Sequence, residues 1–125
     1  MATDQVILEA PVLDAVGDGT RRAILDLLAR SPRSVGELAA ELPVGRPAVS
    51  LHLKVLREAG LVTSSPAGTR NVYRLDSTGL AVLRAYLDRL WAAALDRFAA
   101  AAEATALAEA AWAVPHPENQ GDTPS

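Results

Sequence analysis

The sequence contains no cysteine, and this absence excludes several kinds of chemistry at once. Disulfides, iron–sulfur clusters, thiolate zinc sites and cysteine nucleophiles all require the missing thiol. Histidine is scarce, with two residues in the chain. The sequence also lacks a nucleophile–base pair, a phosphate-binding loop and a cluster of metal ligands. We therefore expect a protein that is not an enzyme and that holds no metal and no cofactor.

Long hydrophobic runs are missing as well. No basic, apolar leader opens the chain, and no charge-free apolar run approaches the roughly 18 residues of a membrane helix. We expect a soluble, cytoplasmic protein with no membrane partner. Half of the 125 residues are hydrophobic, but 25 of them are alanine, which predicts a helical protein with a thin core. One domain is expected over residues 1–112, followed by a disordered acidic tail over 113–125.

Charge is unevenly distributed along the chain. The net charge is −3, which by itself argues against a polyanionic partner. Residues 21–74, however, hold nine of the 12 basic residues and four of the 15 acidic ones, a local net charge of +5. The remaining residues carry −8. A basic middle between acidic ends points to an anionic partner for the middle alone.

Hydrophobic spacing and helix-capping residues predict a mainly α fold with one small β-hairpin. Ser34 and Glu37 form a capping box, Pro47 stands in the first turn of a later helix, and Gly60 ends that helix. Helices are expected over residues 6–16, 20–30, 34–42, 46–59 and 79–110, and hairpin strands over 61–65 and 71–75, joined by a flexible basic tip at 66–70.

The middle elements make a winged helix-turn-helix, with the helix-turn-helix over 34–59 and the wing over 61–75. Its second helix can enter a major groove, while the hairpin tip lies along the adjacent backbone or minor groove. The expected partner is double-stranded DNA. The candidate contacts on the outward side of that helix and at the wing tip are Arg46, Pro47, Ser50, Leu51, Lys54, Arg57, Thr69, Arg70 and Asn71.

Two features allow more than one interpretation. Arg21 and Arg22 begin a helix, where positive charge is mildly unfavourable; they could contact phosphate or pair with Asp18 and Asp26. His52 lies between the inward stripe and the groove face of its helix. For His52 a structural hydrogen bond within the domain is favoured over a base contact.

The last predicted helix is long and amphipathic. The rest of the chain cannot cover it on every turn, so we expect it to join the first helix in a homodimer interface. A small hydrophobic effector could occupy an apolar pocket near Trp91 and Phe98. The expected interface residues are Leu8, Val12, Leu13, Leu83, Leu87, Leu90, Trp91, Ala94 and Phe98.

Four stretches of the chain resemble bacterial repressors of the ArsR/SmtB type. Residues 13–25 resemble the opening of these proteins, residues 34–39 and 46–62 their helix-turn-helix, and residues 68–75 their wing. The resemblance implies a homodimeric transcriptional repressor whose first and last helices pair across a two-fold axis. Such repressors often control their own operon.

The chain departs from the family pattern at several positions. Founding members sense metals through Cys-x-Cys in the first helix of the pair, but residues 37–42 here have no thiol. Another class uses Asp and His on the terminal helix, but residues 79–110 here have no histidine. A metal site of the family type is therefore not expected. Gly19 replaces a usual Pro and Gly45 a usual capping Ser. Leu51 replaces a common Gln, exchanging a hydrogen-bonding side chain for an apolar contact to a thymine methyl.

The leading hypothesis is a sequence-specific, homodimeric and autoregulatory repressor that binds an inverted-repeat operator. One alternative is a winged-helix module that binds protein and not DNA, which the acidic ends and Leu51 favour and the +5 middle disfavours. Another alternative is a repressor released by a small hydrophobic ligand. Neither the operator nor the regulated genes follow from the sequence.

Overall fold

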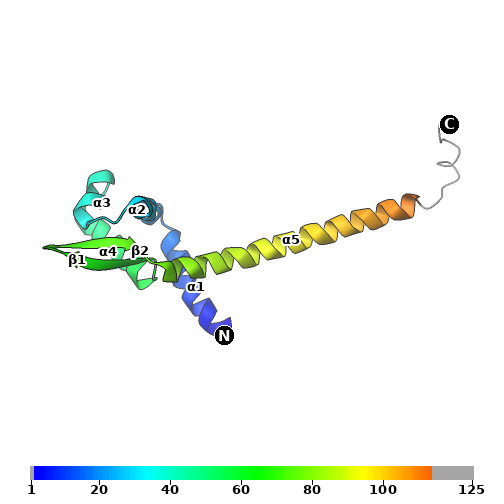
Figure 1. The fold of residues 1–125 in the computed structure, drawn as a ribbon, viewed down its shortest axis with the longest axis horizontal. Helices are drawn as coiled ribbons and strands as arrows, with labels where there is room; N and C mark the ends of the chain where they lie inside the picture. Colours follow the sequence, from blue (N-terminus) through cyan, green and yellow to red (C-terminus); the bar gives the residue numbers. More distant parts are fainter. Residues whose placement is uncertain (1, 114–125) are drawn as a thin grey trace. The chain divides into compact units, whose positions relative to one another are not determined.

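The computed structural model describes the backbone of residues 2–113 and the side chains of residues 9–111 (Figure 1). By its internal contacts the chain forms two units, Met1–Leu87 and Asp88–Ser125. The described part of the second unit is the later portion of the last helix. The elements are α1 (Ala2–Val16), α2 (Gly19–Arg30), α3 (Val35–Glu41), α4 (Arg46–Glu58), β1 (Val62–Ala67), β2 (Arg70–Leu75) and α5 (Ser77–Ala113).

The order of elements is the one that hydrophobic spacing predicts. α1 begins before the expected residue 6 and continues through Pro11, and α5 is longer at both ends than the expected 79–110. Asp18 caps α2 by accepting a hydrogen bond from the Arg21 backbone N–H at 2.9 Å. The expected tail at 113–125 lies, except for its first residue, outside the described residues.

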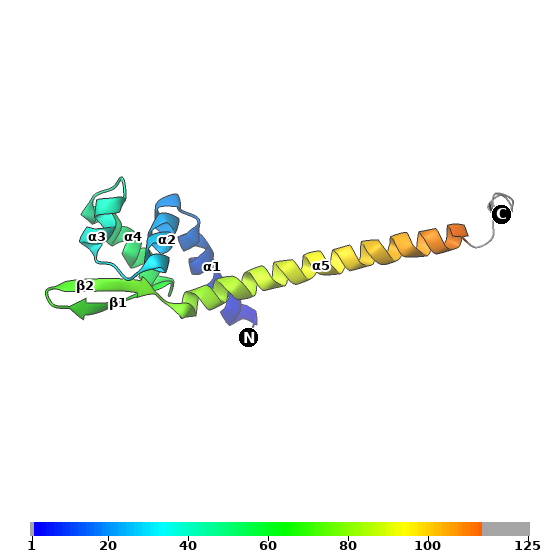
Figure 2. The same ribbon diagram turned by 45° about the horizontal axis from the view of Figure 1, so that its top comes forward.

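The wing hairpin is tighter than expected. β1 pairs antiparallel with β2 from Val62 opposite Leu75 to Ala67 opposite Arg70, which leaves a two-residue turn in place of the expected five-residue tip. Gly68 has φ 64°, a left-handed conformation that glycine adopts without strain. Pro66 cannot donate a ladder hydrogen bond, but both strands of a two-stranded sheet are edge strands, where proline is tolerated. β1 can therefore continue through Pro66. Figure 2 shows this hairpin running beside α3 and α4.

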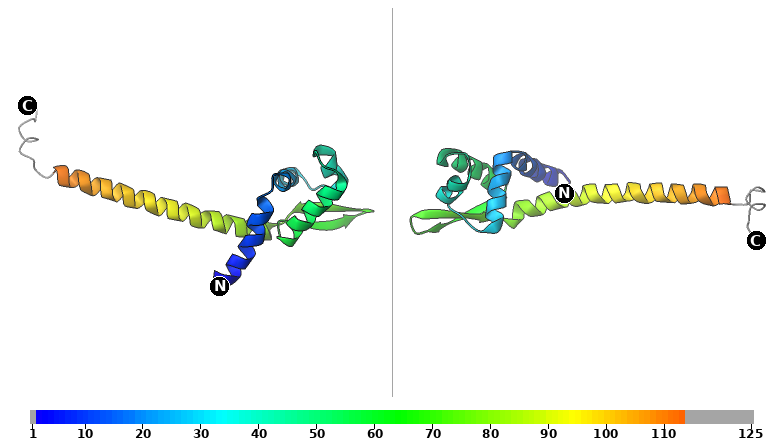
Figure 3. Two further views of the ribbon diagram at one scale, coloured as in Figure 1. Left: turned by 180° about the vertical axis from the view of Figure 1, so that it is seen from behind. Right: turned by 90° about the horizontal axis from the view of Figure 1, so that it is seen from above.

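The core of the first unit is built around α4, which contacts α1, α2, α3 and β1. The rear view in Figure 3 shows α4 beside α1. Val49, Leu53 and Leu56 form the predicted inward stripe of α4 and are fully buried. They pack with buried side chains from the neighbouring elements: Val12, Ala15, Ile24, Leu28, Leu38, Leu61 and Val62.

The burial of Val12 corrects one expectation. Val12 was expected in a dimer interface, but its side chain is 1% exposed and belongs to the core of its own unit. A side chain with no accessible surface has nothing to offer a partner. The spacing of apolar residues in α1 could not separate the face toward α4 from the face toward solvent.

α5 carries large apolar side chains that are exposed along its length. No helix within the described residues is both long and apolar enough to cross a membrane. The exposed apolar residues of α5 are Leu87, Leu90, Trp91, Leu95, Phe98 and Leu107.

Candidate nucleic-acid interface

The capping box at the start of α3 is present as predicted. The Ser34 backbone N–H donates to Glu37 Oε1 at 3.0 Å, and the Glu37 backbone N–H donates to Ser34 Oγ at 3.2 Å. The residue before this cap is tied to the wing, because Arg33 and Tyr73 exchange backbone hydrogen bonds of 3.0 and 2.8 Å. The start of α3 is thereby held against β2.

The outward side of α4 carries the six candidate DNA contacts of this helix. Pro47 lies in its first turn, and Gly45 precedes it without a side-chain cap. Because the buried stripe faces the core, the residues between its members face solvent. Leu51 is 66% exposed, so its side chain is accessible to a partner. All six candidates are exposed: Arg46, Pro47, Ser50, Leu51, Lys54 and Arg57.

The wing tip carries the other three candidates. Thr69 is in the turn, and Arg70 and Asn71 begin β2; all three are exposed. Exposure is what a contact to DNA requires, and the contact itself stays a prediction for all nine residues.

A hollow brings α3, the start of α4 and the wing together. It has a volume of about 500 Å³, and Arg46 lines it together with Arg70 and Asn71. Gly36 and Glu37 of α3 line the same hollow, which we call the α3–wing concavity. Three of the predicted contacts thus share one site. The spacing of residues in the sequence contains no signal that would place Arg46 next to the wing.

Gly36 makes room for the Arg46 side chain. A Cβ built at Gly36 would lie 2.9 Å from Arg46 Nη2 and 3.3 Å from Arg46 Cζ. A Cβ approaches no other atom as closely as 2.9 Å in real structures, so the guanidinium group in this position occupies space that only glycine leaves free. The capping-box pattern of Ser34 and Glu37 contains no signal for this role of Gly36.

Replacing Gly36 by alanine is expected to separate folding from DNA binding. Alanine favours helix over glycine by about 0.5–1 kcal/mol, so the melting temperature should stay the same or rise. The added methyl displaces the Arg46 guanidinium, so affinity for DNA should fall by about threefold, the size of one exposed electrostatic contact. Fluorescence anisotropy with a labelled duplex measures the affinity. In an Arg46→Ala background the same substitution should change affinity no further; an equal loss there would contradict the assignment.

The charge of Glu37 is stabilised by its surroundings. The Ser34 backbone N–H, followed by the Ser34 hydroxyl, lowers the pKa of the Glu37 carboxyl, and the charges of Arg70 and Arg33 lower it further. Arg70 Nη1 lies 3.8 Å from Glu37 Oε1. One turn further along α3, Glu41 forms an ion pair with Arg33. Glu37 is therefore ionised at neutral pH.

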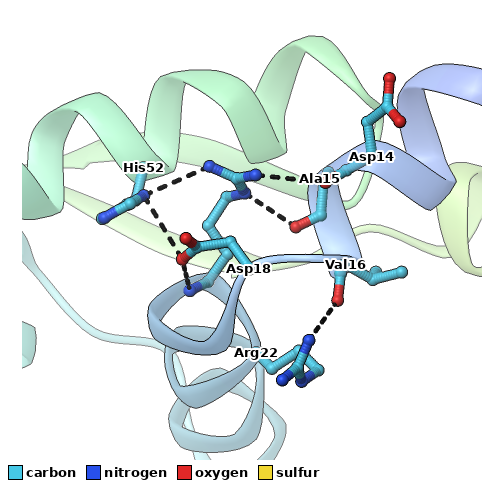
Figure 4. Close-up of polar contacts among 7 residues, drawn as sticks. Asp14, Ala15, Val16, Asp18, Arg22 and His52 are labelled. Atoms are coloured by element: carbon cyan, nitrogen blue, oxygen red, sulfur yellow. Dashed lines mark hydrogen bonds and ion pairs between the residues drawn. The ribbon is translucent and has the colours of Figure 1, made fainter.

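The side chains of Arg21 and Arg22 donate hydrogen bonds to the C-terminal end of α1. Figure 4 shows Arg22 beside Val16. Arg21 Nε donates to the Ala15 carbonyl at 2.7 Å and Arg21 Nη2 to the Asp14 carbonyl at 3.1 Å. Arg22 Nη1 donates to the Val16 carbonyl at 2.8 Å. The last carbonyls of a helix have no partner within it and carry partial negative charge, so guanidinium groups stabilise them. Besides the Arg21 backbone N–H, the Arg21 charge lowers the pKa of Asp18, in agreement with the pairing interpretation for Arg21, and contact with phosphate stays a prediction.

His52 takes part in contacts within the domain. Its Nδ1 atom lies 3.5 Å from Arg21 Nη1 and 4.0 Å from Asp18 Oδ2 (Figure 4). The Arg21 backbone N–H, His52 and the Arg21 charge lower the pKa of Asp18, with the backbone hydrogen bond as the largest cause. These contacts agree with the structural role favoured for His52. The side chains of residues 9–111 include no group of three or more His, Cys, Asp or Glu placed to hold a metal ion.

Comparison with known proteins gives consistent matches over this region. The family model described as bacterial regulatory protein, arsR family, matches residues 18–64. The chain is 64% identical over 85 residues to the HTH-type transcriptional regulator Rv2034 of Mycobacterium tuberculosis, covering 68% of this chain and 79% of that protein. It is 35% identical over 69 residues to the transcriptional repressor SdpR of Bacillus subtilis, covering 55% of this chain and 77% of that protein.

A solved structure with the same fold is the homodimeric winged helix-turn-helix DNA-binding domain of a possible ArsR-family transcriptional regulator from Mycobacterium bovis. The TM-score is 0.57 at 33% sequence identity, and the match covers 77% of this chain and 86% of that one.

Proposed function

Because the chain belongs to the ArsR family of bacterial transcriptional regulators, we propose that it is a sequence-specific repressor that binds an inverted-repeat operator as a homodimer. The relatives are transcriptional regulators and not enzymes, as the sequence predicted for this chain. Its fold is the winged helix-turn-helix. We further propose that it acts in the cytoplasm and represses its own gene.

The observation that carries this proposal is the shared exposure of basic side chains on α4 and the wing. Arg46, Lys54 and Arg57 are exposed on α4, and Arg70 is exposed at the start of β2. Arg46 and Arg70 line the same concavity. With α4 in a major groove, the wing reaches the neighbouring backbone, so cations at both positions meet phosphate. This arrangement favours DNA over a protein as the partner of the basic middle.

Leu51 is proposed to contribute to base recognition. It stands on the exposed side of α4 between Ser50 and Lys54, and its apolar surface is not used in the core. In a major groove the thymine C5-methyl is the apolar group that such a side chain meets. The operator is therefore expected to present a thymine opposite Leu51.

The homodimer is proposed to form through α1 and α5. Leu87, Leu90, Trp91 and Phe98 are exposed, as an interface requires before the partner is present. Leu13, Leu83 and Ala94 are half-buried. Leu8 lies in α1, and its side chain is outside the described residues. The related domain from Mycobacterium bovis is homodimeric, which supports the same assembly here. Release by a hydrophobic ligand near Trp91 and Phe98 stays a prediction.

Binding to the DNA upstream of the chain's own gene tests the proposed function. Lys54→Ala should weaken binding across sequences and reduce the slope of log affinity against log salt by about 0.9 per lost phosphate contact. Arg30→Ala is the matched control, because it removes one exposed cation from the end of α2, outside α4 and the wing. Equal effects of the two substitutions, or an affinity that does not depend on salt, would contradict the proposal.

A further inference from the structure

The α3–wing concavity contains one negative charge among its positive ones. Of the described residues that line it, Glu37 is the sole carboxylate, while Arg46 and Arg70 supply two guanidinium groups. A hollow between a recognition helix and a wing that is lined by two arginines fits a phosphodiester group. The presence of a carboxylate in the same hollow needs a separate explanation.

Glu37 is held in place by the backbone. Its Oε1 atom accepts the 3.0 Å hydrogen bond from the Ser34 N–H, so the carboxylate cannot leave the concavity without breaking the cap of α3. Arg70 is held less firmly. Its Nη1 atom is 3.8 Å from the same oxygen, which is beyond hydrogen-bonding distance but close enough for attraction. Both side chains are more than half exposed, Arg70 at 61% and Glu37 at 52%. The arginine is the movable partner of this pair.

We propose that the α3–wing concavity binds one backbone phosphate of DNA between Arg46 and Arg70, and that this phosphate takes the place of Glu37 as the partner of Arg70. This inference rests on the proposed function and adds to it a phosphate site and an internal competitor. In the free protein the Glu37 carboxylate is the ion-pair partner of Arg70. On the duplex, Arg70 turns to the phosphate, and the fixed carboxylate opposes the phosphate by like-charge repulsion. Glu37 therefore limits the affinity for any duplex, whatever its sequence.

Glu37→Gln tests the competition directly. Glutamine keeps an oxygen that accepts from the Ser34 N–H, so the cap should survive while the charge is lost. Removing an exposed ion pair should tighten binding by about two- to fivefold per recognition domain, and by the square of that factor in a dimer. The salt slope should become steeper, because the carboxylate no longer offsets the charge of Arg70, and the duplex then releases more of its condensed cations. Both the upstream duplex and an unrelated duplex should show the gain.

Glu41→Gln is the matched control. It removes the same charge from the same helix, but Glu41 pairs with Arg33 and does not line the concavity. The Glu41→Gln variant should bind both duplexes with the affinity of the unchanged protein. Arg70→Ala completes the cycle: in that background Glu37→Gln should give a clearly smaller gain, because the competed cation is gone and only the repulsion between carboxylate and phosphate is relieved.

The outcomes distinguish a failure of the phosphate site from a failure of the proposed function. If the unchanged protein binds DNA with a salt dependence but Glu37→Gln binds no tighter, or keeps its full gain beside Arg70→Ala, the phosphate site is wrong and the proposed function stands. If the unchanged protein does not bind DNA, the proposed function itself fails. If Glu37→Gln lowers the melting temperature, the Arg70→Ala variant tests the phosphate site instead. Arg70→Ala should then weaken binding to both duplexes and flatten the salt slope. An unchanged affinity of Arg70→Ala for DNA would overturn the phosphate site.

Discussion

Replacing Leu87 with aspartate is expected to lower operator affinity by roughly 100-fold or more, because it separates the two winged helix-turn-helix units of the proposed dimer. Leu87 is 52% exposed on α5. It belongs to the apolar stripe predicted for that helix, which comprises Leu83, Leu87, Leu90, Trp91, Ala94 and Phe98. In the proposed dimer this side chain would be buried against the partner, and an aspartate there would bring an unpaired charge into the interface. Two half-sites bound jointly gain from a high effective concentration, and monomers lose that gain.

Light scattering and DNA binding together measure this effect. The unchanged chain should have the mass of a dimer at micromolar concentration, and Leu87→Asp should have the mass of a monomer with weak, single-site binding. Ala92→Asp adds the same charge to an exposed position of α5 outside the predicted stripe and should keep the dimer. The interface assignment fails if Leu87→Asp still forms a dimer, or if the two variants behave alike.

Replacing Gly79 with alanine is expected to destabilise the fold by about 2–3 kcal/mol, which is large against a total stability of roughly 5–15 kcal/mol. Gly79 lies in the first turn of α5, and its N–H donates to the Gly60 carbonyl at 2.7 Å. A Cβ at Gly79 would lie 2.6 Å from the Gly60 oxygen and 2.7 Å from the Gly60 carbonyl carbon. These are backbone atoms, so they cannot turn aside as a side chain would. Gly60 itself has φ 76° and is the glycine that ends α4.

Urea unfolding followed by circular dichroism measures the loss. Gly19→Ala is the matched control: its added methyl has its nearest neighbour, Arg22 Nη2, at 3.8 Å. That substitution should be neutral or slightly stabilising, because alanine favours helix. An unfolding free energy for Gly79→Ala equal to that of Gly19→Ala would show that the close approach of α5 to Gly60 is not required.

The elements could be read from the sequence because their causes are local. The Ser34–Glu37 capping box, Pro47 in the first turn of α4 and Gly60 after its end each act within a few residues. The inward stripe of α4 follows from helical periodicity in the same way. The hairpin tip was predicted less well, because pairing across strands, and not local composition, determined how far the strands extend.

The candidate site was predicted in part. The six proposed DNA contacts of α4 are exposed, since residues opposite a buried stripe face solvent, and the three at the wing tip are exposed at the end of the hairpin. The roles of Gly36 and Arg21, and the approach of Glu37 to Arg70, were not predicted. Each depends on a neighbour from another element: Arg46 for Gly36, Arg70 for Glu37, and the end of α1 for Arg21. Val12 shows the same limit, because two faces of one helix can be equally apolar.

The sequence by itself determined the family, the order of helices and wing, and the location of the positive charge in the middle of the chain. These properties follow from periodicity, capping and composition, which act at short range. Only the tertiary structure decided which side chains share the α3–wing concavity and which glycines allow a close approach. Those contacts depend on how elements distant in the sequence pack together, and packing is determined by the shape of the whole core.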